Sequence, residues 1–158
     1  MDSNKIVVKI SDFAIGHDPQ VLTTQGIGSC IAICLYEKEK KIGALAHIML
    51  PQTVRIPSDG TQTNPLRFVN SALPVVISEL EKVGVDKEKV SAKIIGGAHM
   101  FKMLDGIEDD LGSKNLKATE EFLTTNGIKI DSEDVGGNVG RSLEFDLASG
   151  VVKVMTKM

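Results

Sequence analysis

Two side chains able to do covalent chemistry, Cys30 and His47, lie on neighbouring apolar runs of the sequence. A cysteine thiolate can attack a carbonyl carbon, and an imidazole can carry the protons that this attack displaces. Thr24, six positions before the cysteine, has a hydroxyl that could orient the imidazole. A nucleophile, a base and an orienting group together point to covalent acyl transfer.

The two apolar runs, residues 30–36 and 42–50, have the composition of β-strands. Between them lies the polar segment 37–41, whose five residues match the length of a connection between antiparallel neighbours. We therefore predict a β-hairpin that carries the cysteine on one strand and the histidine on the other.

The register of this hairpin decides whether thiol and imidazole meet. Pairing Leu35 with Ile42 places Cys30 opposite His47, and directly opposed residues have Cβ atoms roughly 4.5 to 5.5 Å apart. A slip of one residue would instead place Cys30 opposite Ile48 and turn the histidine to the other face of the sheet. We predict the first register, although the sequence alone leaves the second open.

A purely structural explanation of the two side chains is the alternative. Free cysteines are commonly small buried apolar residues, and a core histidine commonly finds one hydrogen bond. The glycine-containing segment 26–29 directly before Cys30 favours a chemical role, because it allows backbone amides to approach a ligand closely. The amides near Gly28 and Ser29 are our candidates for an oxyanion hole and substrate contact.

The chain has two cysteines, Cys30 and Cys34. On one strand their Cα atoms would lie roughly 13 Å apart, whereas a disulfide needs less than about 7 Å. We therefore predict two free thiols. Because a neighbouring imidazolium lowers the pKa of a thiol, we expect Cys30 to react with iodoacetamide at about pH 6 and the buried Cys34 not to react.

Five segments carry short motifs, most of them with glycine, in a fixed order along the chain. They are TQGIGSCIAICLY at 24–36, GALAHIMLP at 43–51, IGGAHMF at 95–101, LGSKN at 111–115 and DVGGNVGR at 134–141. Together they closely resemble the CheD family, the chemoreceptor glutamine deamidases of bacterial and archaeal chemotaxis. By that resemblance Cys30 is the nucleophile, His47 the general base and Thr24 the third member of the catalytic set.

The resemblance implies an enzyme that hydrolyses the side-chain amide of glutamines in chemotaxis receptors to glutamate and ammonia. It also implies a complex with the CheC phosphatase, and it requires no metal or organic cofactor. Two other activities stay open: a module that mainly binds CheC, and a transglutaminase in which an amine replaces water. The implied fold is α+β, with layered, mostly antiparallel β-sheets and helices packed outside, like the catalytic domain of the cytotoxic necrotizing factor toxins.

The composition fits one domain over residues 1–158. The chain has a formal net charge of −3 and a pI near 5.6, which gives no basic field for nucleic acid or an anionic membrane. The N-terminus lacks the pattern of a secretory signal, and no apolar run approaches the length of a membrane span. We therefore expect a cytoplasmic protein without membrane insertion.

Two further kinds of site are disfavoured by spacing. A zinc site would need a second close pair of ligands beside Cys30, Cys34 and His47, which the sequence does not supply at finger or ribbon spacing. The glycine cluster 136–140 is followed by a strand pattern and lacks the Lys-Ser/Thr of a phosphate loop. We predict neither a metal nor a nucleotide.

The remaining chain alternates between strand and helix patterns in an order typical of α+β proteins. Pro74 lies inside the first helical pattern, so we expect a kink near residues 70–73, and we expect Ser113 to cap the second helix. His99 is a possible second catalytic histidine or, alternatively, a surface residue. Predicted strands are 5–10, 21–24, 90–95, one that starts at 128–130, 141–147 and 151–155. Predicted helices are 65–83 and 113–126, and predicted loops are 12–20 and the substrate-contacting 51–64.

Overall fold

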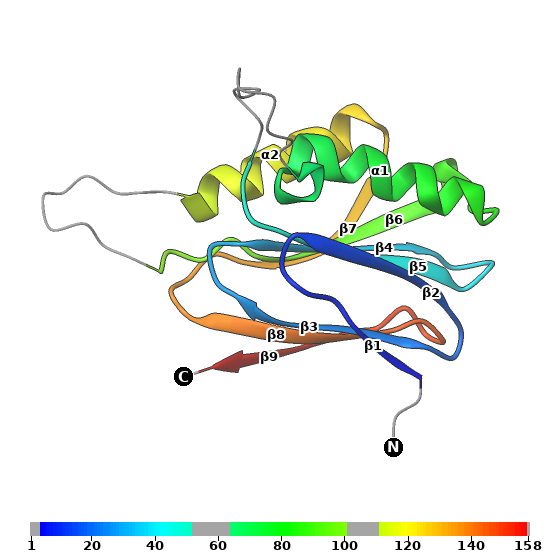
Figure 1. Ribbon diagram of the computed structural model, residues 1–158, viewed down its shortest axis with the longest axis horizontal. Coiled ribbons are helices and arrows are strands. Elements are labelled where there is room, and N and C mark those ends of the chain that lie inside the picture. The colour runs from blue at the N-terminus through cyan, green and yellow to red at the C-terminus, as the bar shows by residue number, and fades with distance from the viewer. Residues whose placement is uncertain (1–3, 52–63, 101–110, 158) are drawn as a thin grey trace, which may run out of the picture.

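The computed structural model describes residues 4–51, 64–100 and 111–157, and their elements stack in three layers (Figure 1). Two helices cover one face of a five-stranded sheet, and a four-stranded sheet covers the other face. The predicted α+β class, with layered and mostly antiparallel sheets and helices outside, is confirmed for these residues, whereas the likeness to the cytotoxic necrotizing factor fold stays a prediction. The strands are β1 Lys5–Val7, β2 Asp12–His17, β3 Val21–Ile27, β4 Ile31–Glu37, β5 Ile42–Ile48, β6 Val90–Gly96, β7 Lys129–Val135, β8 Gly140–Asp146 and β9 Val152–Lys157.

The predicted hairpin, β4 and β5, lies at the centre of the five-stranded sheet, whose order is β2-β5-β4-β6-β7. A strand that is covered on both faces needs apolar residues at every position rather than at alternate ones. This requirement explains the continuous apolar sequence of β4, in which only Tyr36 is not buried. The sheet is antiparallel except for the pairing of β6 with β7.

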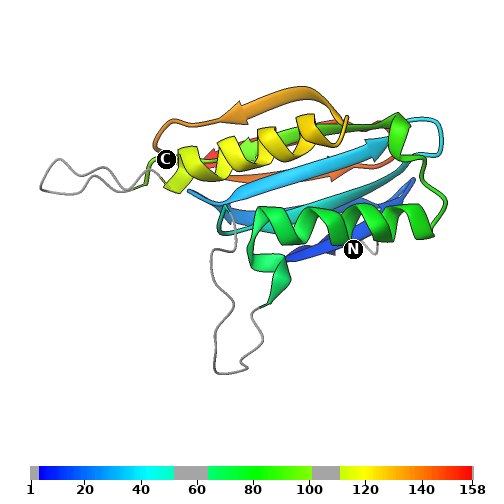
Figure 2. The same ribbon diagram turned by 90° about the horizontal axis from the view of Figure 1, so that it is seen from above.

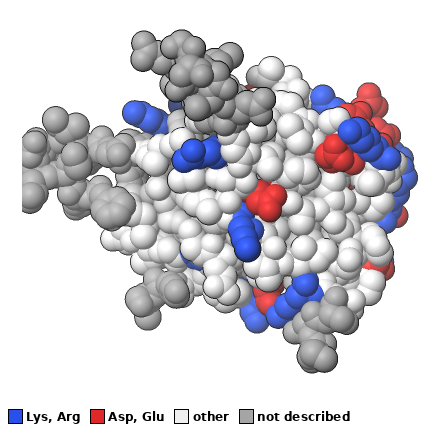
Figure 3. Space-filling view, in the orientation of Figure 1, with Lys and Arg blue, Asp and Glu red and all other residues white. Residues whose placement is uncertain are grey.

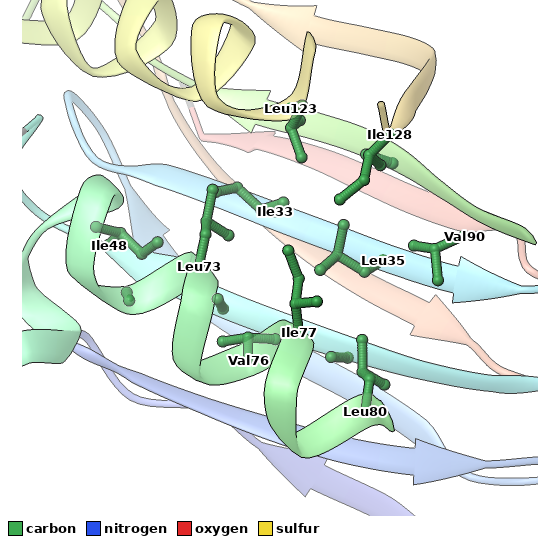
Figure 4. Packing of buried hydrophobic residues seen from close by; sticks show 14 of the residues in the cluster. Ile33, Leu35, Ile48, Leu73, Val76, Ile77, Leu80, Val90, Leu123 and Ile128 are labelled. Carbon is green, nitrogen blue, oxygen red and sulfur yellow. The ribbon is translucent and has the colours of Figure 1, made fainter. Parts of the chain in front are cut away.

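Side chains of the hairpin alternate between two hydrophobic cores, because successive residues of a strand point to opposite faces. Ile31, Ile33 and Leu35 face the helices and pack with α1 (Val69–Lys82), as Figure 4 shows for the last two. Ala32 and Cys34 face the four-stranded sheet. Even-numbered positions of β4 therefore point into the space between the two sheets.

The four-stranded sheet has the order β1-β3-β8-β9. After β1 the chain leaves this sheet and reaches the other one: Val8 N–H donates to Thr23 O, and Ser11 N–H donates to His47 O. β1 is therefore shorter than the predicted first strand, 5–10. The pairing of β3 with β8 is irregular between Thr24 and Ile27.

The first helix starts with a 3-10 turn, Pro65–Arg67, which the side chain of Asn64 caps by accepting from Leu66 N–H. Phe68 has an extended backbone, and α1 then runs without a break through Pro74. The helical backbone is interrupted at Phe68, and the kink expected near residues 70–73 stays a prediction. Pro74 is the sixth residue of α1 and lacks the N–H that would donate within the helix.

The second helix, α2 (Leu111–Thr125), lies beside α1 on the same face of the sheet (Figure 2). Ser113 lies within the helix, so its predicted role as the cap is wrong. Gly127 follows with a φ of +70°, a left-handed conformation that favours glycine after a helix end.

One edge strand lies where the sequence predicted a loop. The predicted loop 12–20 contains β2, which pairs with β5 from Phe13 opposite Ala46 to Gly16 opposite Gly43. The strand predicted to start at 128–130 is β7, which runs to Val135 although most of its side chains are exposed. Both lie at the edges of the sheet, where polar side chains meet solvent and the apolar pattern of a strand is lost. The strand predictions at 90–95 and 141–147 and the terminal hairpin are confirmed.

The charged side chains on the face shown in Figure 3 are of both signs, and uncharged surface lies between them. No helix in the described part of the chain is both long and apolar enough to cross a membrane. The predicted substrate-contacting segment 51–64 lies, apart from its two end residues, outside the described residues.

Leu73 tests the packing of α1 because its side chain is fully buried against the central hairpin. Leu73→Ala should lower the free energy of unfolding by about 2–5 kcal/mol, since it removes buried methyl groups and leaves a cavity. Urea denaturation followed by circular dichroism measures this change. Val83→Ala is the control, because Val83 is 52% exposed and should cost less than about 0.5 kcal/mol. Equal effects of the two variants would contradict the packing.

Candidate active site

The hairpin has a different register from the predicted one. β4 and β5 pair Ile31 with Ile48 and Ala32 with His47, so Cys30 is opposite neither His47 nor, as in the alternative register, Ile48. The prediction is wrong by two residues. A slip of two keeps every side chain on its face, and His47 therefore still points to the side that Ala32 occupies.

Glu37 explains the error in register. It continues β4 and pairs with Ile42, so the connection is shorter than the predicted segment 37–41. Its buried carboxylate accepts hydrogen bonds from Lys40 N–H at 3.1 Å and from Asp86 N–H at 2.8 Å. These two donors stabilise a charged residue inside the sheet, at a position where its polar character predicts the connection between the strands.

The structure brings Thr24 and His47 into direct contact across the two sheets. Both side chains are 1% exposed, and Thr24 Oγ1 lies 2.8 Å from His47 Nδ1. The same hydroxyl donates its only proton to Val8 O at 2.7 Å. It must therefore accept a hydrogen bond from Nδ1–H, which assigns the neutral imidazole to the tautomer with its proton on Nδ1.

The other ring nitrogen of His47 is consequently an unprotonated acceptor. Nε2 is buried and has no hydrogen-bond partner among the residues that the structure describes. Burial also lowers the pKa of His47 to about 4, because a desolvated imidazole resists gaining a charge. The ring is thus neutral at pH 7, with one lone pair held inside the site.

Cys30 lies directly before β4, with a half-buried free thiol. It is two positions from Ala32, the residue opposite His47, so Cys30 and His47 belong to the same end of the hairpin. Burial raises the pKa of the Cys30 thiol, an effect that its own backbone N–H partly offsets. Both shifts oppose the expected thiolate and imidazolium pair, because each favours the neutral form of its group.

The segment that leads into Cys30 is held in place by hydrogen bonds that its backbone carbonyl groups accept. Gly97 N–H donates to Cys30 O at 2.8 Å, and Ala98 N–H donates to Gly28 O at 3.0 Å. Gly96 has a φ of +114°, and a Cβ atom there would lie 2.4 Å from Cys30 O. Gly96 of the IGGAH motif thus has to be glycine, because the backbone carbonyl of Cys30 passes directly over it.

The backbone carbonyl of Ser29, in the same loop, accepts a hydrogen bond from a side chain of α2. Asn115 Nδ2 donates to Ser29 O at 2.8 Å and to Met49 O at 2.9 Å. In the sequence this asparagine was recognised only as the last residue of the LGSKN motif, without any contact assigned to it. The matching GSKN motif was the available signal, but nothing in it indicates which carbonyl groups the amide reaches.

Comparison with known proteins decides the family. Residues 49–156 match the family model described as CheD chemotactic sensory transduction. A protein of Clostridium botulinum strain Hall is 41% identical over 157 residues, covering 99% of this chain and 95% of that protein. A protein of Clostridium kluyveri is 43% identical with the same coverage. The chain belongs to the CheD family. Both relatives are named probable chemoreceptor glutamine deamidase CheD.

The CheD family model matches a range that begins after Thr24, Cys30 and His47. The roles of these three residues in this CheD-family chain therefore rest on their geometry. His99, within the matched range, is exposed, and its Nε2 lies 3.5 Å from Ser113 Oγ on α2. Its surface position favours the non-catalytic interpretation. No group of three or more His, Cys, Asp or Glu side chains in the described ranges is placed to hold a metal ion.

Cys34 differs from Cys30 in its surroundings. Its side chain is fully buried, and burial raises the pKa of its thiol further above the usual range. It lines a separate cavity of about 200 Å³ with Tyr36 and Lys93, which contains none of the three candidate residues. The two cysteines are therefore an internal comparison for reactivity.

Because the pKa of Cys30 is raised, its alkylation by iodoacetamide should be slow near pH 6 and should increase with pH up to and beyond about pH 9. Mass spectrometry of the Cys30 peptide, with free cysteine as the reference, measures the rate. Cys30 should react more slowly than free cysteine at about pH 8, and Cys34 should not react while the protein is folded. Fast alkylation of Cys30 near pH 6 would instead indicate a stable thiolate beside an imidazolium.

Proposed function

We propose that this chain hydrolyses the side-chain amide of glutamine residues in chemotaxis receptors, giving glutamate and ammonia. The carrying observation is the hydrogen bond from His47 Nδ1–H to Thr24, which leaves a buried Nε2 without a partner among the described residues, at the end of the hairpin where Cys30 lies. Membership of the CheD family and the names of the two relatives supply the substrate class.

The first chemical step forms the bond between sulfur and carbon. A glutamine carboxamide binds beside Cys30, Sγ attacks its carbonyl carbon, and the thiol proton passes to His47 Nε2. Since thiol and imidazole are both neutral before the attack, the proton moves as the bond forms. The carbonyl oxygen becomes an oxyanion, which accepts from the Cys30 backbone N–H and from the amides near Gly28 and Ser29.

The second step releases ammonia. His47 Nε2–H gives its proton to the departing nitrogen, the bond between carbon and nitrogen breaks, and a thioester on Cys30 remains. An imidazole with a pKa of about 4 is a weak base but, once protonated, a strong acid, so it returns the proton readily. Thr24 accepts from Nδ1–H throughout and keeps the ring from rotating.

The third step restores the enzyme. A water molecule gives a proton to His47 Nε2 while its oxygen attacks the thioester carbon, and the bond between carbon and sulfur then breaks. The histidine proton passes to Cys30 Sγ, and glutamate leaves. The cycle consumes one water and one amide and produces one carboxylic acid and one ammonia, without a metal or organic cofactor.

The partners in this proposal are the receptors, as substrates, and the CheC phosphatase, as a binding protein in the cytoplasm. The CheC partnership rests on the family resemblance of the sequence motifs. If CheC covers the catalytic end of the hairpin, it competes with receptors for Cys30. The alternative function, a CheC-binding module with little deamidase activity, would use the same surface without the chemistry.

Ammonia release from a purified receptor cytoplasmic fragment tests the proposal. Cys30→Ala should lower the rate by about 10³-fold or more, because no acyl intermediate can form without the thiol. Cys34→Ala is the matched control and should keep the rate within about threefold, since it lies roughly 13 Å further along β4.

Two results would contradict the proposed deamidase. A wild-type protein that binds CheC but releases no ammonia from receptor, with or without CheC, would favour the binding module. Loss of activity in Cys34→Ala together with full activity in Cys30→Ala would identify Cys34 as the nucleophile and contradict the proposed role of Cys30.

A further inference from the structure

One side-chain amide joins the two strands that carry the proposed nucleophile and base. Asn115 is 0% exposed, and its Nδ2 uses both protons, one on Ser29 O at 2.8 Å and one on Met49 O at 2.9 Å. Ser29 directly precedes Cys30, and Met49 follows His47 by two positions. The amide therefore contacts the backbone on both sides of the reaction centre.

These two hydrogen bonds begin where the strand pairing ends. The last paired residues of the hairpin at this end are Ile31 and Ile48, so Ser29 and Met49 lie beyond the regular ladder. Asn115 adds a side-chain link between the two chains at that point. Each segment is also bonded to other parts of the fold, but beyond Ile31 and Ile48 the described residues show no direct backbone hydrogen bond between the two segments.

The position of the asparagine is itself fixed by close packing. A Cβ atom on Gly112, one turn earlier in α2, would lie 2.4 Å from Ala98 O and 2.6 Å from Gly97 O. Gly97 and Ala98 are the residues whose N–H groups hold the cysteine loop. The first turn of α2, the loop and the hairpin end thus form one rigid unit.

The helix itself does not require an asparagine at this position. Asn115 Oδ1 is buried and, in the described part of the chain, has no hydrogen-bond partner. A buried acceptor without a partner costs free energy that an apolar side chain would not cost. What an apolar residue cannot supply is the pair of donors for two carbonyl groups on different strands.

We propose that Asn115 is a positioning residue that sets the distance between Cys30 Sγ and His47 Nε2 through these two hydrogen bonds. The inference rests on the proposed deamidase function. It assigns Asn115 no contact with the substrate, so substitution should change kcat and leave KM largely unaltered. A displacement of about 1 Å between reacting groups can lower a rate by about 100-fold.

Asn115→Leu removes both donors and keeps the branched shape of the side chain. On a receptor cytoplasmic fragment we expect kcat to fall about 100-fold and KM to stay within about twofold, with rates normalised to the folded fraction from circular dichroism. Asn126→Leu is the matched control. Asn126 lies at the other end of the same helix, where its amide donates to Phe122 O at 2.8 Å, and this variant should keep wild-type kcat.

Asn115→Asp adds a pH signature that general loss of stability would not produce. A carboxylate would repel both carbonyl groups, whereas a protonated carboxyl can donate to one of them, and burial raises the pKa of such a group. The kcat of Asn115→Asp relative to wild type should therefore increase as the pH falls from about 8 to about 5.5. The same ratio for Asn115→Leu should be independent of pH.

The outcomes separate this inference from the proposed function. An active wild type together with a folded Asn115→Leu variant whose kcat stays within about threefold of wild type would overturn the positioning role alone. A higher KM with unchanged kcat would also overturn it, because it would indicate substrate binding. A wild type that releases no ammonia would overturn both proposals.

Discussion

The hydrogen bond between Thr24 and His47 is the interaction on which the proposed site depends. It crosses from the four-stranded sheet to the five-stranded sheet, and the hydroxyl donates onward to Val8 O. Because a hydroxyl has one proton, the two hydrogen bonds run in one direction, from His47 Nδ1–H to Thr24 and from Thr24 to Val8 O. The lone pair of the ring is therefore on Nε2. The packing of two sheets therefore selects the tautomer of one ring, and only that tautomer can accept a proton from a thiol beside it.

Burial sets the chemistry of the pair. It raises the pKa of Cys30 and lowers the pKa of His47 to about 4, so both groups are uncharged before substrate binds. Charge develops only during the attack, when the oxyanion and the imidazolium form together and the backbone N–H of Cys30 and the hydroxyl of Thr24 lie nearby. The anchored carbonyl groups of the cysteine loop keep these groups in place, which reduces the reorganisation that the reaction requires.

The sequence contains the candidate residues and their faces but not the contacts that hold them. An even shift keeps every paired side chain on its face, so the error of two residues in register left His47 on the side that Ala32 occupies. The register itself depended on Glu37, a charged residue whose burial follows from two backbone donors, one of them on the distant Asp86. Asn115 escaped prediction because its partners lie 86 and 66 positions away, and only the packing of α2 brings them together.

The protonation of His47 tests the central claim most directly. Nitrogen-15 NMR of the imidazole near pH 7 distinguishes the two ring nitrogens, and Thr24→Val, which removes the acceptor for Nδ1–H, is the comparison. The account predicts a proton on Nδ1 and none on Nε2 in the wild type, and a mixture of tautomers in the variant. A wild-type ring with its proton on Nε2, or a doubly protonated ring, would contradict it.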